Sequence, residues 1–264
     1  MLIDEINALY LSKFGRLPNL ENPTGYNDII QWLKLHDQKA SQVWACDKLS
    51  ARQMAPEWAR VLLLSAGNHL PEHHYPYVVK TTHDSGTSFV IKDKLDLLAA
   101  RPKINRAATL LYGVGKGEWA YRYITPMIIA EEYVQEASTD YKFHISGGVV
   151  RWVQVIWDRG KHTKEAIFSD DGKVMALHMD DKMVHAPDQS KYPGDAAWEQ
   201  LTKLALMLAE PYRYVRVDLY WAGKPLFGEL TFWPRAGCYK SKHEPLFGEI
   251  LEMDLSYKLE PICQ

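Results

Sequence analysis

The segment YRYVRVDLYWAGKPLFGELTFWP, residues 212–234, decides the fold because it predicts a β-hairpin that carries acidic side chains. Two runs rich in aromatic and β-branched residues flank Ala222-Gly223-Lys224. This pattern predicts two antiparallel strands with their turn at these three residues. Asp218 lies on the first strand and Glu229 on the second. A short turn brings both carboxylates to one patch of the sheet.

Two carboxylates that converge on one face of a sheet are costly unless a cation neutralises them. Arg216 lies two residues before Asp218 and points to the same face, so it offers one such cation. Mg²⁺ is another candidate, since it takes one or two carboxylates and completes its shell with water and phosphate oxygens. Taken alone, the hairpin favours an ordinary salt bridge over a metal site.

The composition limits the class of protein. The chain has 264 residues, 47% of them hydrophobic, enough for one large domain or two closely packed lobes. A net charge of -2 lacks the basic excess of nucleic-acid binders, so no nucleic acid partner is expected. Cys46, Cys238 and Cys263 are far apart and form no CxxC pair, which favours a reducing cytoplasm. We expect no signal peptide and no transmembrane segment.

The periodicity of apolar residues predicts a mixture of helices and strands. Helices are expected over 2–14, 25–37, 46–67 (bent near Pro56), 95–114 (interrupted at Pro102) and 195–210. Strands are expected over 75–81, 87–93, 126–134, 140–146 and 149–158, in addition to the hairpin above. The segment 170–194 is rich in Asp, Lys, His and Pro, which predicts an excursion over the surface or a mobile loop.

A lysine and a loop of small residues separate two of these strands, in YVVKTTHDSGTSFVI, residues 77–91. Lys80 ends the first strand, and Thr81 to Ser88 offer backbone N–H groups and hydroxyls that could bind phosphate. Gly86 lets the backbone approach a ligand closely. No GxxxxGK[ST] pattern is present, so the segment alone favours an ordinary hairpin. The glycines of Gly113 to Gly117 have neither Walker nor Rossmann spacing and predict a turn after a helix.

A third segment, IIAEEYV, residues 128–134, is an apolar strand that ends in two glutamates and an aromatic residue. It is typical of a plain edge strand. It is equally typical of a hinge where the backbone pairs with adenine and a carboxylate binds a ribose hydroxyl. By itself this segment decides nothing.

Taken in order, these segments resemble the TupA-like branch of the ATP-grasp family. The resemblance runs from about residue 27 to 250 and is carried by IIQWLKLHD, ACDKLSAR, YVVKTTHDSGTSFVIKDK, EWAYRYITPMIIAEEYV, DYKFHISGG and RVDLYWAGKPLFGELTFWPRAG. It implies an α+β ATP-grasp fold, in which two antiparallel-sheet lobes with helices sandwich the nucleotide. It also implies an N-terminal helical segment (1–46), a lid subdomain (47–134) and a C-terminal lobe with the metal site (135–264).

The resemblance assigns roles to residues at the matching positions. ATP is expected to contact Lys48, Lys80, His83, Ser85, Gly86, Thr87, Ser88, Glu131, Glu132, Tyr133, Val134, Asp140 and Lys142. Asp218, Glu229 and Thr231 are expected to bind two Mg²⁺ ions. Many ATP-grasp ligases carry Asn at the place of Thr231, whereas the TupA-like branch tends to carry Glu-Leu-Thr there. Arg216, Lys80 and Arg235 are the expected catalytic residues.

The activity that the resemblance implies is ATP- and Mg-dependent carboxylate–amine ligation through an acyl phosphate. TupA-like proteins are associated with teichuronopeptide and polysaccharide biosynthesis, so we expect a sugar acid or amino acid as substrate and polysaccharide-assembly enzymes as partners. Arg159, His162 and Arg235 are acceptor-side candidates, and each is also a plausible surface salt-bridge partner. A kinase acting on a small-molecule or sugar hydroxyl and a non-catalytic nucleotide-binding module stay open as alternatives. A DxD motif is lacking, which disfavours a glycosyltransferase.

Overall fold

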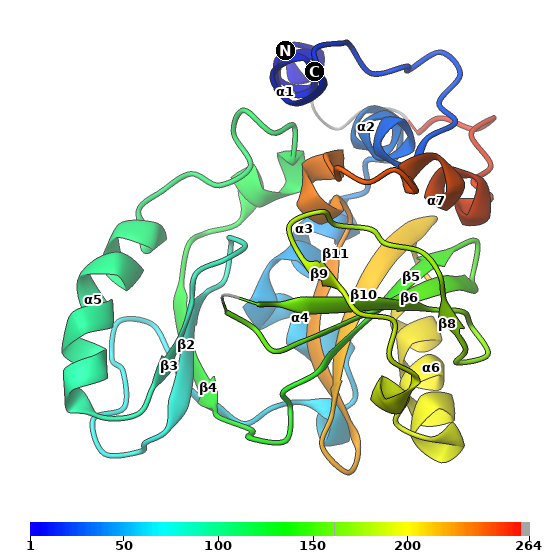
Figure 1. Cartoon of the computed structure of the whole chain (residues 1–264). Helices are drawn as coiled ribbons and strands as arrows, with labels where there is room; N and C mark the ends of the chain where they lie inside the picture. Colours follow the sequence, from blue (N-terminus) through cyan, green and yellow to red (C-terminus); the bar gives the residue numbers. More distant parts are fainter. Residues whose placement is uncertain (161, 260–264) are drawn as a thin grey trace.

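Two β-sheets organise the computed structural model, which describes residues 1–160 and 162–259 (Figure 1). The small sheet has the strand order β1-β4-β2-β3: β1 (Leu63–Ala66), β4 (Ile128–Glu132), β2 (Tyr77–Thr81) and β3 (Ser88–Ile91). The large sheet has the order β11-β10-β5-β6-β7-β8, with β9 (Val184–His185) beside β7. Its other strands are β5 (Asp140–Ser146), β6 (Val149–Trp157), β7 (Lys164–Phe168), β8 (Val174–Met175), β10 (Tyr214–Trp221) and β11 (Pro225–Thr231).

Helices surround the two sheets. They are α1 (Leu2–Phe14), α2 (Tyr26–His36), α3 (Ala40–Cys46), α4 (Lys48–Met54), α5 (Lys94–Ala108), α6 (Asp195–Ala209) and α7 (Glu244–Leu251). Four short 3₁₀ helices complete the described elements: η1 (Glu57–Ala59), η2 (Trp119–Tyr123), η3 (Gln189–Lys191) and η4 (Pro234–Gly237). In the part of the chain that the structure describes, no helix is both long enough and apolar enough to cross a membrane.

Helix α5 covers the outer face of the small sheet. Tyr77, Val79 and Ile91 from the sheet are buried against Leu97 and Ile104 from the helix. Because side chains alternate along a strand, Val78 and Lys80 of β2 project from the opposite face, as do Ile129 and Glu131 of β4. This opposite face of the small sheet is the one free to meet a ligand. The predicted strands 75–81, 87–93 and 126–134 are confirmed.

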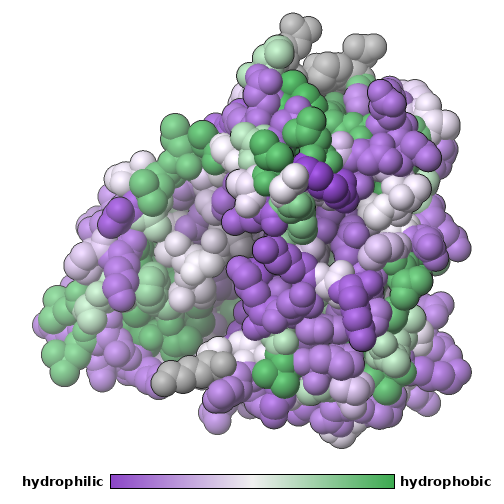
Figure 2. All heavy atoms as spheres, turned by 45° about the horizontal axis from the view of Figure 1, so that its top comes forward, coloured by the Kyte–Doolittle hydropathy of each residue, from purple (hydrophilic) through white to green (hydrophobic). Residues whose placement is uncertain are grey.

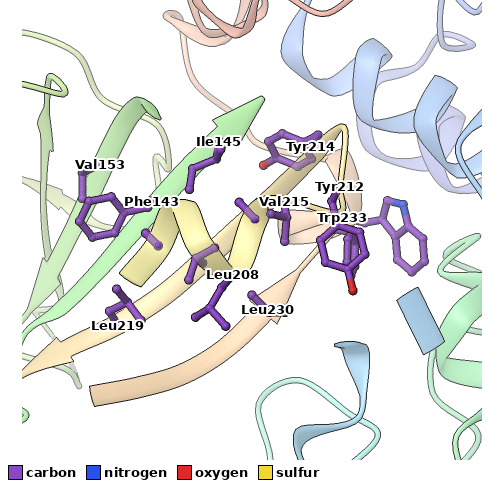
Figure 3. Close-up of a cluster of buried hydrophobic side chains, with 14 of the residues drawn as sticks. Phe143, Ile145, Val153, Leu208, Tyr212, Tyr214, Val215, Leu219, Leu230 and Trp233 are labelled. Atoms are coloured by element: carbon purple, nitrogen blue, oxygen red, sulfur yellow. The ribbon is translucent and has the colours of Figure 1, made fainter. Parts of the chain in front are cut away.

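Helix α6 covers one face of the large sheet. Phe143, Val215, Leu219 and Leu230 from the sheet gather with Leu208 of the helix in one buried cluster (Figure 3). The alternation of each strand leaves polar side chains on the other face. Glycines 147 and 148, with φ of 57° and 74°, form the tight β5–β6 turn that the sequence predicts.

Two sequence predictions need correction. The helix expected over 46–67 ends at Met54, and Leu63–Ala66 forms strand β1 instead because it pairs with β4. Helix α5 is not interrupted at Pro102. Pro102 has no N–H to donate to the carbonyl of Leu98, four residues before it. Leu98 is 57% exposed, so water can reach that oxygen. The glycines of 113–117 form turns after α5, as the sequence predicts.

The segment 170–194 is an excursion that packs back onto the large sheet. It contributes β8, β9 and η3, and it buries Met179 and Asp180. The small sheet has a hydrophobic cluster of its own, drawn from residues 64–130, while Ala45, Ala51 and Ala59 belong to the cluster of the large lobe. The three-part division of the chain stays a prediction.

Candidate functional site

A buried ion network lies at the centre of the polar face of the large sheet. Arg216 donates from Nε to Asp218 Oδ1 at 2.6 Å and from Nη2 to Asp218 Oδ2 at 2.8 Å. Lys142 Nζ, on the neighbouring strand β5, donates to the same Oδ2. Lys142 is the register partner of Asp218, and all three side chains are buried. The carboxylate is therefore held from two sides by cations.

The charges of this network keep Asp218 ionised. Burial alone raises the pKa of the carboxyl, but Arg216 and Lys142 outweigh burial and lower it to about 2. Burial lowers the pKa of Lys142, and Asp218 opposes this effect. A carboxylate with so low a pKa is a permanent anion, ready to bind a metal ion or to orient a guanidinium.

Glu229 lies directly across from Asp218, as the sequence predicts, because the register of β10 and β11 pairs them. Its Oε1 is 3.4 Å from Arg216 Nη2, which also donates to Thr231 Oγ1 at 3.1 Å. Gly228 makes this close pairing fit, since a Cβ there would lie 2.9 Å from the Asp218 carbonyl oxygen. The Glu229 side chain is 32% exposed and that of Asp218 only 3%, so Glu229 is the more open of the two.

These donors suit Mg²⁺. The ionised Asp218 and the partly exposed Glu229 supply two carboxylates, and Thr231 adds a hydroxyl oxygen. Mg²⁺ takes one or two carboxylates when phosphates and water complete its shell. They do not form an all-protein cage, because the described residues hold no cluster of three His, Cys, Asp or Glu that could bind a metal alone. Arg216 and Lys142 presently occupy the Asp218 oxygens, so a metal ion would share them.

The small sheet carries an ion pair on the face opposite α5. Lys80 Nζ lies 2.7 Å from Glu131 Oε2, and Arg52 Nε lies 3.9 Å from Glu131 Oε1. Lys48, the first residue of α4, donates from Nζ to the carbonyl of Asp84 and from its backbone N–H to the carbonyl of Thr82 at 3.0 Å. The structure thus brings Lys48 to the start of the lysine loop, 32 positions before Lys80 in the sequence.

The loop between β2 and β3 is anchored at its start and open at its tip. His83 is buried, and its Nε2 lies 2.9 Å from the carbonyl oxygen of Leu110. Ser85, Gly86 and Ser88 are exposed, and Thr87 is half-buried. Gly86 has a φ of 105°, which side-chain-bearing residues rarely adopt. Only the tip of the loop is therefore free to move onto a ligand.

Helix α4 links the two charged faces: it packs against β11 of the large sheet, and its first residue, Lys48, is hydrogen-bonded to the loop of the small sheet. Tyr220 of β10 has a raised pKa, chiefly through burial. Arg159 opposes this rise, whereas Glu229 of the large sheet and Glu131 of the small sheet add to it. Figure 2 shows the surface hollowed between the two lobes, with hydrophilic residues along its edge. Two further cavities, of about 560 and 510 Å³, lie outside this hollow, one beside α1 and the other along α6.

The remaining predicted residues are engaged in ion pairs of their own or are wholly or partly exposed. Asp140, on the same face of β5 as Lys142, is buried and paired with the exposed Arg159. Arg235 Nε lies 3.0 Å from Asp180 Oδ2. Glu132 and Tyr133 are exposed, Val134 is half-buried and His162 is exposed.

Several residues of the site are not predicted by the sequence. Arg52 reaches Glu131, and Asp180 holds Arg235, although no spacing pattern links either pair. Gln154 is the register partner of Lys142 and donates to Glu165 Oε2 at 2.5 Å. A polar residue in the otherwise apolar stretch VQVIW is the one signal that could have pointed to Gln154.

Comparison with protein families identifies the pattern. A model of the TupA-like ATPgrasp family matches residues 28–251, most of the chain. A search of curated protein sequences finds no match.

Solved structures of several ligases are distantly similar. D-alanine–D-alanine ligase from Bacillus anthracis, complexed with ATP, is 16% identical, with a TM-score of 0.42 over 85% of this chain and 62% of that one. L-amino acid ligase from Bacillus licheniformis is 12% identical, with a TM-score of 0.46 over 94% and 56%. Biotin carboxylase from Campylobacter jejuni is 13% identical, with a TM-score of 0.46 over 97% and 53%. The chain spans less than two thirds of each, and no functional inference rests on these likenesses.

Proposed function

This chain belongs to the TupA-like ATP-grasp family, and from that premise we propose that it is an ATP- and Mg-dependent carboxylate–amine ligase that releases ADP. One observation carries the proposal most strongly: α4, which begins at Lys48, packs against β11, the strand of Glu229, and Lys48 is hydrogen-bonded to the lysine loop of the small sheet. A nucleotide between the sheets would meet Lys80 and Lys48 on the lid side and the Arg216–Asp218–Lys142 network on the other.

The lid side suits the triphosphate and the base. Lys80 and Lys48 supply two ammonium groups, and the exposed Ser85, Gly86 and Ser88 supply hydroxyls and backbone N–H groups for phosphate oxygens. The end of β4, from Glu131 to Val134, would pair with the adenine edge. Asp140, or a neighbour of it, would hold the ribose. Lys80 would exchange its bond to Glu131 for a phosphate, and Arg52, 3.9 Å from Glu131, would remain beside that carboxylate.

The large-sheet side suits the reaction. A substrate carboxylate oxygen attacks the γ-phosphorus of ATP, the bond to the bridging oxygen breaks, and ADP leaves. An amine then attacks the acyl phosphate carbon, inorganic phosphate leaves, and the amine loses a proton as the amide forms. Arg216, oriented by Asp218, would stabilise the anionic oxygens of the acceptor. Mg²⁺ held by Asp218, Glu229 and Thr231 would neutralise phosphate charge.

The substrates and setting are the finer part of the proposal. A sugar acid or an amino acid of a cell-surface polysaccharide precursor would supply the carboxylate, and the ligation would take place in the cytoplasm, where ATP is available. Arg235, Arg159 and His162 would lie on the acceptor side. Polysaccharide-assembly enzymes would be the partners that take up the product.

The proposal is tested by measuring ADP release from purified protein over paired carboxylates and amines, with mass spectrometry of the products. An amide product that requires both substrates is the expected result. A phosphoester formed without any amine would instead identify a kinase. ATP binding without turnover across the panel would favour a nucleotide-binding module. Glu229→Gln serves as the inactive control, because Glu229 is the more exposed of the two carboxylates.

A further inference from the structure

Helix α5 carries apolar side chains on two opposite faces. Its inner face packs on β2 and β3 of the small sheet through Leu97, Ala100 and Ile104, which are buried. With 3.6 residues per turn, Leu95 and Leu98 lie on the opposite face, and they are 75% and 57% exposed. In Figure 1 α5 forms the left edge of the molecule, and no other described helix or strand lies outside it. The outer face therefore has no partner among these elements.

This outer face has the composition of a binding surface. Ala99 and Pro102 extend the apolar stripe of Leu95 and Leu98 along the helix, and both are exposed. A surface helix ordinarily turns charged and polar side chains to water on this side. Exposed apolar side chains continue just past the helix at Leu111, which is 76% exposed. Such a concentration of exposed apolar side chains marks an interaction site.

Cations border the apolar stripe. Residues 92–106 contain five cations and two acids, in a chain whose net charge is -2. Both acids are engaged: Asp93 accepts from the N–H groups of Leu95 and Asp96 at 2.8 and 2.9 Å, and Asp96 accepts from that of Lys92 at 3.0 Å. In the part of the chain that the structure describes, the side chains of the five cations form no hydrogen bond or ion pair. These cations are Lys92, Lys94, Arg101, Lys103 and Arg106. Unpaired positive charge beside exposed leucines is typical of helices that bind a membrane surface or a protein partner.

The geometry favours a membrane surface over a protein that grips the helix. The outer side of a helix is convex, and the two cavities described above are lined by residues of other segments. A protein groove that receives a basic amphipathic helix needs more of its circumference than α5 offers, because Leu97 and Ile104 hold the inner face on the sheet. A lipid surface needs one side only, and long lysine and arginine side chains reach its headgroups.

We propose that α5 docks the protein on the surface of a membrane that contains anionic lipids. Leu95 and Leu98 enter the boundary between headgroups and acyl chains, and the cations beside them pair with lipid phosphates. The contact is shallow. Pro102 leaves the carbonyl of Leu98 without a helical donor, so this oxygen has to stay within reach of water.

Docking through α5 leaves the candidate active site accessible. The helix covers one face of the small sheet, and Lys80 and Glu131 project from the other. A membrane-bound protein therefore keeps this second face free for ATP. The docking surface does not rest on the proposed function, because none of its residues belongs to the candidate active site.

Co-sedimentation with vesicles tests the proposal. The full chain is mixed, without ATP, with vesicles of phosphatidylcholine alone or of phosphatidylcholine and phosphatidylglycerol. It should bind the anionic vesicles, more weakly as salt rises, and leave the neutral vesicles unbound. Lys94→Gln/Arg106→Gln should weaken binding about 30-fold, the scale of two cations at an anionic surface. Lys182→Gln/Lys224→Gln removes the same charge from exposed sites outside α5 and should change binding little.

The leucines are tested separately. Leu95→Ser/Leu98→Ser should weaken binding about tenfold without altering the charge, because it removes apolar area from the contact. Leu11→Ser/Leu17→Ser, at sites that are 52% and 55% exposed outside α5, is the matched control. Thermal melting checks that each variant is folded. Glu229→Gln should bind vesicles as the wild type does, so this test and the ligase assay fail independently.

Three results would overturn the proposal. The first is no binding to anionic vesicles, which would leave the face to a protein partner or to a second copy of the chain. Another is binding to neutral vesicles as tight as to anionic ones. The last is unchanged vesicle binding by the leucine variant or by the cation variant of α5, since either would show that the contact is made by charge alone or by another surface.

Discussion

The two faces that meet at the candidate site are built very differently. On the large sheet, Asp218 is locked between Arg216 and Lys142, and all three side chains are buried. On the small sheet, Lys80 pairs with Glu131, which Arg52 also approaches at 3.9 Å, and the tip of the loop beyond them is exposed. One face is fixed before any ligand arrives, whereas the other has freedom to close. Changes on the large sheet should therefore cost stability as well as activity, and changes on the lid should cost binding alone.

The largest effect is expected at Asp218. Asp218→Asn removes the anion that Arg216 and Lys142 share and leaves Arg216 only Glu229, 3.4 Å away, which should destabilise the fold by about 3–5 kcal/mol. It also removes a metal ligand, so turnover should be lost. Urea denaturation and ADP release measure the two effects. Asp171→Asn is the matched control: Asp171 is exposed, pairs with Lys173 at 2.5 Å and accepts a hydrogen bond from Ser169, so neither quantity should change much. A stable and active Asp218→Asn would show that neither the fold nor turnover depends on the ion network of the large sheet.

Lys34 gives the next largest effect and a pH signature. This buried lysine donates to Gln31 Oε1 and to the carbonyls of Lys116 and Ala236, at 2.7, 2.7 and 2.8 Å. It thereby pins η4, where Arg235 and Ala236 adopt left-handed φ values of 53° and 55°. Burial lowers its pKa from 10.5 to about 8. Between these values the unfolded chain binds more protons, so stability rises with pH.

The contribution of Lys34 should increase by about 3 kcal/mol from pH 8 to above 10.5, from the difference in pKa. Urea denaturation of wild type and Lys34→Met at pH 7 and pH 9.5 measures it. The wild type should gain stability relative to the variant as the pH rises. Parallel pH dependences in the two proteins would show that folding does not lower the pKa of Lys34.

Lys80 tests the small sheet, the face that has freedom to close. Lys80→Ala should weaken ATP binding about 10- to 100-fold, since one charge-assisted contact to phosphate contributes about 1.5–3 kcal/mol. The melting temperature should change little, because the Lys80 side chain is partly exposed and Arg52 remains near Glu131. Titration calorimetry with MgATP measures binding, and Lys103→Ala is the control. A large loss of stability with unchanged ATP affinity would reverse the assignment of the two faces.

Gly86 should give the smallest effect. A Cβ at this position meets no atom within 4 Å, but the φ of 105° disfavours any side chain, at a cost of about 1 kcal/mol. Gly86→Ala should therefore raise the KM for ATP a few-fold and lower the melting temperature by only about 2 °C. Gly67→Ala, with a similar φ of 106° outside the loop, separates this effect from general backbone strain. Equal KM changes in both variants would contradict a specific role of the loop.

The sequence predicts the parts of the site that depend on residues close together in the chain. Asp218 and Glu229 are placed together by alternation along two strands and a short turn, and the register confirms that pairing. Contacts between the site and residues far away in the sequence cannot be predicted in this way. Lys34 and Ala236 are 202 residues apart, and Asp180 lies in a segment without periodicity. Strand β1 was missed because its partner β4, and not its own pattern, makes it a strand.

Hydrogen–deuterium exchange with and without MgATP tests most directly whether a nucleotide bridges the two faces. Protection should appear together in residues 80–88 of the lid and 216–231 of the large sheet, and not in α5, residues 94–108. The lid should show the larger change, because its loop is the less ordered partner before binding. Protection of one face alone, or none at either, would contradict the account.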